Sequence, residues 1–144
     1  MSLKSKVLLF LQFTTILVLL FNFKIQPESG WIIVEILGFL LSLWGIVVLR
    51  IGNFNAQPEV KTGAQLIMTG PYRFSRNPIY SGLIIFFGAS IVSEPSWINI
   101  ISFTLLTVVL ILKIKMEETF LEKRFGKAYT EHKKKTFALI PLIW

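Results

Sequence analysis

The chain has 144 residues, of which 53% are hydrophobic and 14% aromatic, and fifteen Lys and Arg against eight acids give a net charge of +7. A mean hydropathy of +0.66 is too high for a soluble domain, because one core of this size cannot bury so many apolar residues. The sequence therefore predicts a single domain, 1–144, of an integral membrane protein. The lack of cysteine and the single histidine, His132, exclude disulfides, thiolate chemistry and a histidine metal cluster.

Four apolar segments approach the length of a membrane-spanning helix, which is about 20 residues. We place these spans at about residues 7–23, 31–49, 79–93 and 97–112. Residues 93–96, which include a proline, form a turn that would join the last two spans into a helical hairpin. The predicted fold class is therefore all-α and integral to the membrane, with four transmembrane helices.

The positive charges indicate how these spans are oriented. Fourteen of the fifteen Lys and Arg lie before the first span, between the second and third, or after the fourth, and only Lys24 lies elsewhere. Because cytosolic loops of membrane proteins are enriched in Lys and Arg, both termini should be cytosolic. The predicted localisation is therefore a multi-pass membrane protein with its two long charged segments, 50–78 and 113–144, in the cytosol.

The fourth apolar segment should continue well beyond the bilayer. Ser96 is a favourable N-cap and Gly126 a favourable helix stop, so a helix between them would be about 45 Å long. Its cytosolic end would stand beside the loop that leads into the third span and would form a cleft at the membrane surface. Gly38, Gly45 and Gly52, spaced by seven residues, predict a smooth packing seam along the second span.

Residues 69–82 form the first candidate functional cluster, with two arginines, two tyrosines and two prolines just before the third span. The prolines restrict the backbone, so the segment can hold side chains at fixed positions. Alternatively, Tyr72, Tyr80, Arg73 and Arg76 only anchor the helix among lipid headgroups. The segment alone does not decide between these interpretations.

The second candidate cluster is Lys113, Glu117 and Glu118. Lys113 and Glu117 are four residues apart, so they share one face of a helix. Glutamates beside an anionic leaflet are unfavourable, which favours a functional role over a solvated charge run.

These clusters belong to a longer series of separated motifs. Its members are Arg76-Asn77-Pro78-Ile79-Tyr80, then Glu117-Glu118 and Leu121, then Phe125-Gly126, Tyr129 and Pro141. Over about residues 50–141 the series resembles the isoprenylcysteine carboxyl methyltransferases and the related phospholipid methyltransferases. The resemblance implies S-adenosylmethionine-dependent methyl transfer to a lipophilic or amphiphilic acceptor at the membrane–cytosol interface.

The resemblance also implies a cytosolic cofactor pocket built from the 50–78 loop and the C-terminal helical extension. The chain has no glycine-rich dinucleotide fingerprint, which agrees with such a pocket. By the resemblance, S-adenosylmethionine would be contacted by Gln57, Ala64, Gln65, Leu66, Ile67, Tyr72, Asn77, Pro78, Ile79, Tyr80 and Glu117.

The expected catalytic residues are Lys113, Arg76 and Glu118. Lys113 stands where the family has an arginine that faces the methyl-accepting group, and Asn77 stands where histidine is commoner. A carboxylate acceptor needs a cation to orient it, which Lys113 or Arg76 would supply, whereas an amine must lose a proton and would favour Glu118. The sequence leaves the acceptor open among a prenylated cysteine, a phospholipid amine and another amphiphile.

Two other functions compete with methyl transfer. A small four-helix transporter would use Glu35 in the second span as its ion-coupling carboxylate. A structural membrane protein would use the basic tail, residues 133–135, to bind lipid headgroups. The expected partners are membrane lipids and a lipophilic acceptor, with neither nucleic acid, since the tail lacks a basic stripe with stacking aromatics, nor a metal.

Overall fold

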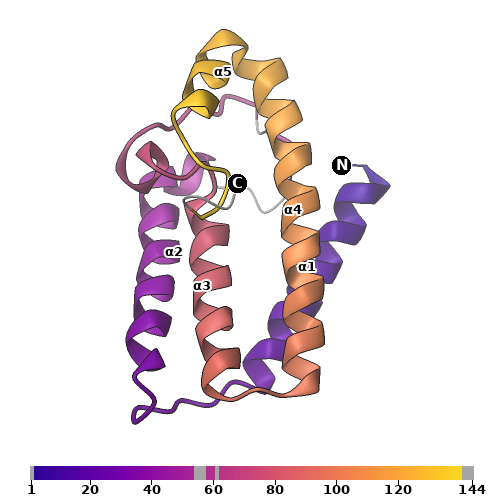
Figure 1. Cartoon of the computed structure of the whole chain (residues 1–144). Helices are drawn as coiled ribbons and strands as arrows, with labels where there is room; N and C mark the ends of the chain where they lie inside the picture. The colour runs from indigo at the N-terminus through magenta and orange to yellow at the C-terminus, as the bar shows by residue number, and fades with distance from the viewer. Residues whose placement is uncertain (1, 54–57, 61, 141–144) are drawn as a thin grey trace.

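The computed structural model describes residues 2–53, 58–60 and 62–140, and this part of the chain is helical (Figure 1). Five α-helices and one 3-10 helix occur in it, and its only β-type pairing is an isolated bridge between Ser75 and Phe137. The elements are α1 (Leu3–Phe21), α2 (Trp31–Asn53), η1 (Gly70–Arg73), α3 (Pro78–Ser93), α4 (Trp97–Phe125) and α5 (Lys127–Lys134). The all-α prediction is therefore confirmed for the described residues.

Helix α4 begins and ends where the sequence predicts. The Ser96 hydroxyl accepts a hydrogen bond from the Asn99 backbone nitrogen at 3.2 Å, which caps the first turn. At the other end Gly126 adopts a positive φ of 52°, which L side chains rarely adopt, and the chain turns into α5. The helix has 29 residues, or about 44 Å at 1.5 Å per residue.

Three of the helices are long and apolar enough to cross a membrane: α1, α2 over Trp31–Leu49, and α4. Helix α3 is also apolar but has only 16 residues. The structure thus supports the predicted spans at 7–23, 31–49 and 97–112 by length and composition, and the span at 79–93 stays a prediction.

The helices associate as two close pairs, α1 with α4 and α2 with α3. The predicted glycine seam makes the second pair close: a Cβ atom on Gly38 would lie 2.6 Å from the Phe86 nitrogen, and one on Gly45 would lie 2.9 Å from Ile79 Cγ1. The seam is therefore confirmed at these two glycines. Gly52 belongs to α2, but its surroundings lie outside the described side chains.

The segment after α5 returns to the start of α3, as Figure 1 shows. The Phe137 nitrogen donates to the Phe74 carbonyl at 3.0 Å, and the Arg76 nitrogen donates to the Phe137 carbonyl at 2.8 Å. Next along the chain, Ala138 and Leu139 pack against Ile114 of α4. The C-terminal segment thereby links α4 to the loop that precedes α3.

Candidate active site

A cavity of about 540 Å³ lies between the two helix pairs. Residues 58–60 and 64–67, η1 and α5 complete its wall, so the cleft predicted between α4 and the loop before α3 is part of this cavity. Its polar lining comprises Gln12, Ser42, Glu59, Gln65, Tyr72, Arg76, Asn77, Tyr80, Lys113, Glu117, Tyr129 and His132.

The cavity has a polar and an apolar part. Most polar lining residues lie where α3 begins and α5 covers the cavity, whereas the α3 residues two turns further along are Phe86 and Phe87. The exposed apolar side chains of the lining all come from α1 and α2 and are Phe13, Leu20, Phe39, Leu43 and Ile46. The apolar part therefore borders the outer surface of the bundle along α1 and α2.

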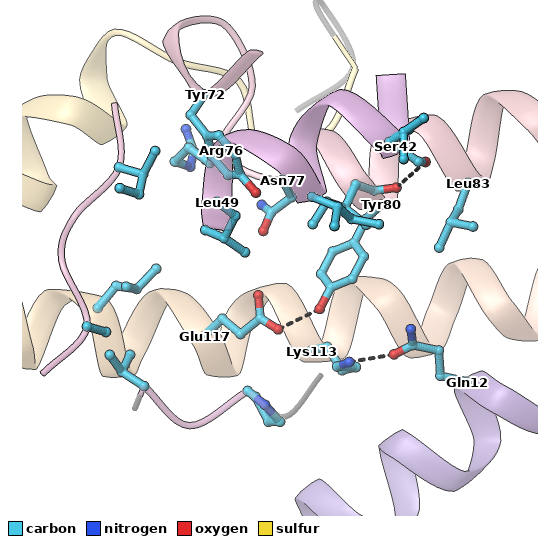
Figure 2. A pocket seen from close by; sticks show the side chains of 18 of the residues that line it. Gln12, Ser42, Leu49, Tyr72, Arg76, Asn77, Tyr80, Leu83, Lys113 and Glu117 are labelled. Atoms are coloured by element: carbon cyan, nitrogen blue, oxygen red, sulfur yellow. Dashed lines mark hydrogen bonds between the residues drawn. The ribbon is translucent and has the colours of Figure 1, made fainter. Parts of the chain in front are cut away.

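Tyr80 and Glu117 join α3 to α4 inside the cavity. The Tyr80 hydroxyl donates a hydrogen bond to Glu117 Oε1 at 2.6 Å (Figure 2). A carboxylate held by a phenol still has lone pairs for further donors. The fold thus brings together two expected cofactor contacts that are 37 positions apart in the sequence.

Lys113 lies one turn before Glu117 on α4, and its side chain is completely buried. Its Nζ atom donates a hydrogen bond to Gln12 Oε1 of α1 and lies 5.3 Å from the centroid of the Tyr80 ring (Figure 2). An ammonium over an aromatic face is attracted to the ring quadrupole. The expected acceptor-side cation is therefore inside the cavity, between α1 and α3.

Arg76 lines the cavity and also anchors the surrounding elements. Its Nε donates to Glu118 Oε1 at 2.8 Å, and its Nη1 donates to the backbone carbonyls of Lys133, at 3.1 Å, and Thr136. Glu118 in turn pairs with Lys133 Nζ at 2.7 Å. Glu118 is not among the lining residues, so its observed contacts hold Arg76 and α5 in place.

Asn77 has a comparable anchoring contact. Its Nδ2 donates to the Ala138 carbonyl at 2.8 Å, and the nearby Ser81 hydroxyl donates to the Leu139 carbonyl at 2.7 Å. The side chain that replaces the family's commoner histidine thus fastens the C-terminal segment while it lines the cavity.

The other expected cofactor contacts are distributed as follows. Ala64, Gln65, Leu66, Ile67, Tyr72 and Ile79 line the cavity. Pro78 is buried in the first turn of α3 and is not among the lining residues, and Gln57 lies outside the described residues.

Burial determines the protonation of three cavity-lining side chains that come from η1 and α5. Burial, and to a smaller extent the charge of Glu117, raises the pKa of Tyr72 above its ordinary value, and burial similarly raises the pKa of Tyr129. Burial and the neighbouring Arg76 charge lower the pKa of His132. At neutral pH these three side chains are therefore uncharged hydrogen-bonding groups.

The sequence does not identify five of the polar lining residues as part of a site: Gln12, Ser42, Glu59, Tyr129 and His132. Tyr129 belongs to a motif that gives it no specific role, and His132, as the single histidine, indicates only that a histidine metal cluster is excluded. Gln12 and Ser42 interrupt apolar spans, and a polar residue that faces the interior of a bundle is the available signal for them.

The sequence of residues 29–128 matches the family described as phospholipid methyltransferase. The match covers more than half of the chain and contains α2, η1, α3 and α4, whereas α1 lies outside it. No curated protein matches the sequence significantly. The matched region includes Tyr80, Lys113 and Glu117 of the cavity. The chain therefore belongs to the phospholipid methyltransferase family of membrane methyltransferases.

Proposed function

We propose that the protein transfers a methyl group from S-adenosylmethionine to a lipophilic acceptor at the membrane–cytosol interface. The observation that carries this proposal is one cavity in which a polar part, with Tyr80 and Glu117, adjoins an apolar part bordered by α1 and α2. Such a cavity suits two different ligands, a polar cofactor and a lipid-like molecule.

The chemistry of the polar lining fits the cofactor. S-adenosylmethionine has ammonium and ribose hydroxyl donors, a carboxylate and an adenine ring, and it supplies a methyl group on a positively charged sulfur. Glu117 would accept from the ammonium or the ribose hydroxyls, and the phenol of Tyr72 and the amide of Asn77 would bond its polar atoms. Residues 64–67 and Ile79 would contact its remaining surface.

The apolar part fits an acceptor that arrives from lipid. Exposed apolar side chains of α1 and α2 border it, so an acyl or prenyl chain could enter without leaving an apolar environment. Positioning should dominate the rate, because methyl transfer needs only a nucleophile held in line near the methyl group. Lys113 and Arg76 would position an anionic acceptor. Glu118 would act through Arg76 rather than by contact.

We further propose that the chain is one domain, 1–144, with four spans, and that the pocket and both termini face the cytosol. In support, α3 starts beside the cavity and turns directly into α4 through residues 93–97, so α3 and α4 form the predicted hairpin. The described parts of the two basic segments, 50–53, 58–60, 62–78 and 113–140, lie at the same end of the bundle as the start of α3 (Figure 1).

Family membership does not favour the transporter interpretation based on Glu35. The Glu35 side chain is buried on α2, but it is not among the residues that line the cavity. A membrane methyltransferase accounts for the two long cytosolic segments, for which a minimal transporter has no evident use.

Calorimetry with S-adenosylmethionine tests the proposal. The full chain in an uncharged detergent should bind the cofactor without added metal, and Glu117→Gln should weaken binding by about tenfold or more, since a charge-assisted hydrogen bond is lost. Glu131→Gln, a matched change at an exposed position of α5, should bind like the wild type. Absence of binding to the wild type, or equal binding by Glu117→Gln, would contradict the proposal.

A further inference from the structure

Gln12 lies on α1, outside the region shared with the family, and its Oε1 accepts a hydrogen bond from Lys113 Nζ. We propose that Gln12 is a specificity-determining residue, which together with Lys113 forms a binding site for the anionic oxygen of a lipophilic acceptor. The proposal rests on the function proposed above, because it names the acceptor class for the same cavity.

The two side chains meet in a site that is closed to bulk water. Lys113 is completely buried and Gln12 is nearly so, although 101 positions separate them in the sequence. A buried ammonium must be matched by oxygen ligands, and Gln12 Oε1 is such a ligand. The packing of α1 on α4 therefore fixes the position of the ammonium inside the cavity.

The two charges of α4 point to different parts of the cavity. Both lie near Tyr80 of α3, but Glu117 accepts a hydrogen bond from the Tyr80 hydroxyl, whereas Lys113 donates one to Gln12 of α1 (Figure 2). The negative group thus serves the part proposed for the cofactor, and the positive group serves the part beside α1. An acceptor that carries a negative oxygen is attracted to this second position, and a protonated amine is repelled from it.

The Gln12 side chain supplies a second hydrogen-bond donor group next to the Lys113 ammonium. Since its Oε1 accepts from Lys113, its Nε2 group points away from that bond, and Figure 2 shows it on the side of Leu83. Within the part of the chain that the structure describes, this amide group donates to no protein atom. An ammonium and an amide N–H side by side are a donor set for an anionic oxygen.

Helix α1 also supplies the apolar environment next to these donors. Phe13, Ile16 and Leu20 follow Gln12 along the helix, and all three line the cavity. The fitting ligand is therefore an amphiphile whose anionic head binds Gln12 and Lys113 while its chain lies along α1. A lipid carboxylate and a lipid phosphate diester share this chemistry.

Binding of simple amphiphiles tests the site independently of turnover. We would titrate the full chain in maltoside detergent with dodecanoate and with dodecylamine, which have chains of equal length and opposite charge. The wild type should bind dodecanoate about tenfold more tightly, and Gln12→Met, which keeps the volume but removes the amide, should lose most of this preference. Asn22→Ala removes an exposed amide at the C-cap of α1, which donates to the Val18 carbonyl, and it should leave the preference unchanged.

The outcomes separate the inference from the proposed function. Equal binding of the two amphiphiles by the wild type would overturn the inference, as would an unchanged preference in Gln12→Met with an unchanged melting temperature. Loss of cofactor binding in the wild type, together with a Gln12-dependent preference for dodecanoate, would contradict the proposed function and leave the anion site supported.

The source of the anionic oxygen is distinguished by the methylated product. After incubation of lipids with the radiolabelled methyl donor, a base-labile label would identify a methyl ester and hence a carboxylate acceptor. A base-stable label in a phosphate-containing lipid would identify an amine acceptor anchored through its phosphate. Either result supports the inference, and a methylated lipid without any anionic group would overturn it.

Discussion

Arg76 Nε lies 2.8 Å from Glu118 Oε1, and the two side chains are only 8% and 10% exposed. This ion pair connects the loop before α3 with α4, and Lys133 extends it to α5. Because Arg76 also donates to the Thr136 carbonyl, the pair holds together the three elements that cover the polar part of the cavity.

Removal of one partner of this pair should destabilise the protein strongly. Glu118→Gln leaves the Arg76 charge buried without its carboxylate, so we expect a loss of about 3 kcal/mol in the free energy of unfolding. Thermal or denaturant unfolding in detergent measures this loss. Glu131→Gln breaks the exposed pair with Lys134 and should cost less than about 1 kcal/mol. Similar losses in both variants would show that the Arg76–Glu118 pair has no special structural role.

The close contact of α2 with α3 leads to a second prediction. Gly38→Ala would place a Cβ atom 2.6 Å from the Phe86 nitrogen, which belongs to the backbone and cannot move aside alone. The helices must then separate, at a cost of about 1–3 kcal/mol. Gly88→Ala is the matched control, because the nearest atom would be at an ordinary distance of 3.5 Å. A melting temperature lowered only by Gly38→Ala would support the seam, and equal melting temperatures would contradict it.

His132 should make stability dependent on pH. Burial and Arg76 lower its pKa in the folded protein below the ordinary value of 6.5, so the unfolded chain binds the proton more readily. This contribution leaves stability unchanged above pH 6.5 and reduces it as the pH falls from 6.5 toward the lower folded pKa. Melting temperatures of the wild type and His132→Gln at pH 8.0 and 5.5 measure the effect. On acidification the melting temperature of the wild type should fall further than that of His132→Gln, and equal decreases would contradict the prediction.

The orientation of the chain in the membrane is testable with reporter fusions. Fourteen of the fifteen Lys and Arg lie on one side of the four-span arrangement, so fusions after Lys24 and after Glu94 should report an external location. A fusion at the C-terminus should report a cytosolic location. A cytosolic signal at either of the first two positions would mean that α3 does not span the membrane or that another span is misplaced.

Local signals in the sequence predicted the helices well. Ser96 and Gly126 define α4 because capping depends on residues next to one another, and the spacing of Gly38 and Gly45 predicts the seam because it follows helix geometry. The anchoring contacts of Arg76 could not be predicted in this way. They join residues 42 to 60 positions apart, so they depend on the path of the chain after α5.

Sequence-based prediction has the same limit for individual residues of the candidate site. Glu117 and Glu118 are neighbours, and successive side chains on a helix point about 100° apart, so only one of them can face the cavity. The sequence does not say which one, and the structure directs Glu117 inward and Glu118 to Arg76. Gln12 lies outside the family motifs, and its role depends on the packing of α1 against α4.

Turnover in variants of Lys113 tests its acceptor-side role, because its ammonium lies inside the cavity beside Gln12. With an anionic acceptor, Lys113→Ala removes the charge that orients the nucleophile and should lower kcat/KM by about tenfold to a thousandfold. Lys113→Arg keeps the charge and should retain most of the activity. Lys115→Ala, an exposed position two residues further along α4, is the matched control and should behave like the wild type.

The same variants distinguish an anionic acceptor from an amine acceptor that carries no anionic group. A fixed cation repels a protonated amine. For such an acceptor, turnover by Lys113→Ala should therefore equal or exceed that of the wild type, and Lys113→Arg should not be faster than Lys113→Ala. Cofactor affinity must be measured alongside turnover, because Lys113 and Glu117 interact electrostatically on one face of α4. If Lys113→Ala lost cofactor affinity to the same extent as activity, Lys113 would belong to the cofactor part of the cavity, and its acceptor-side role would be wrong.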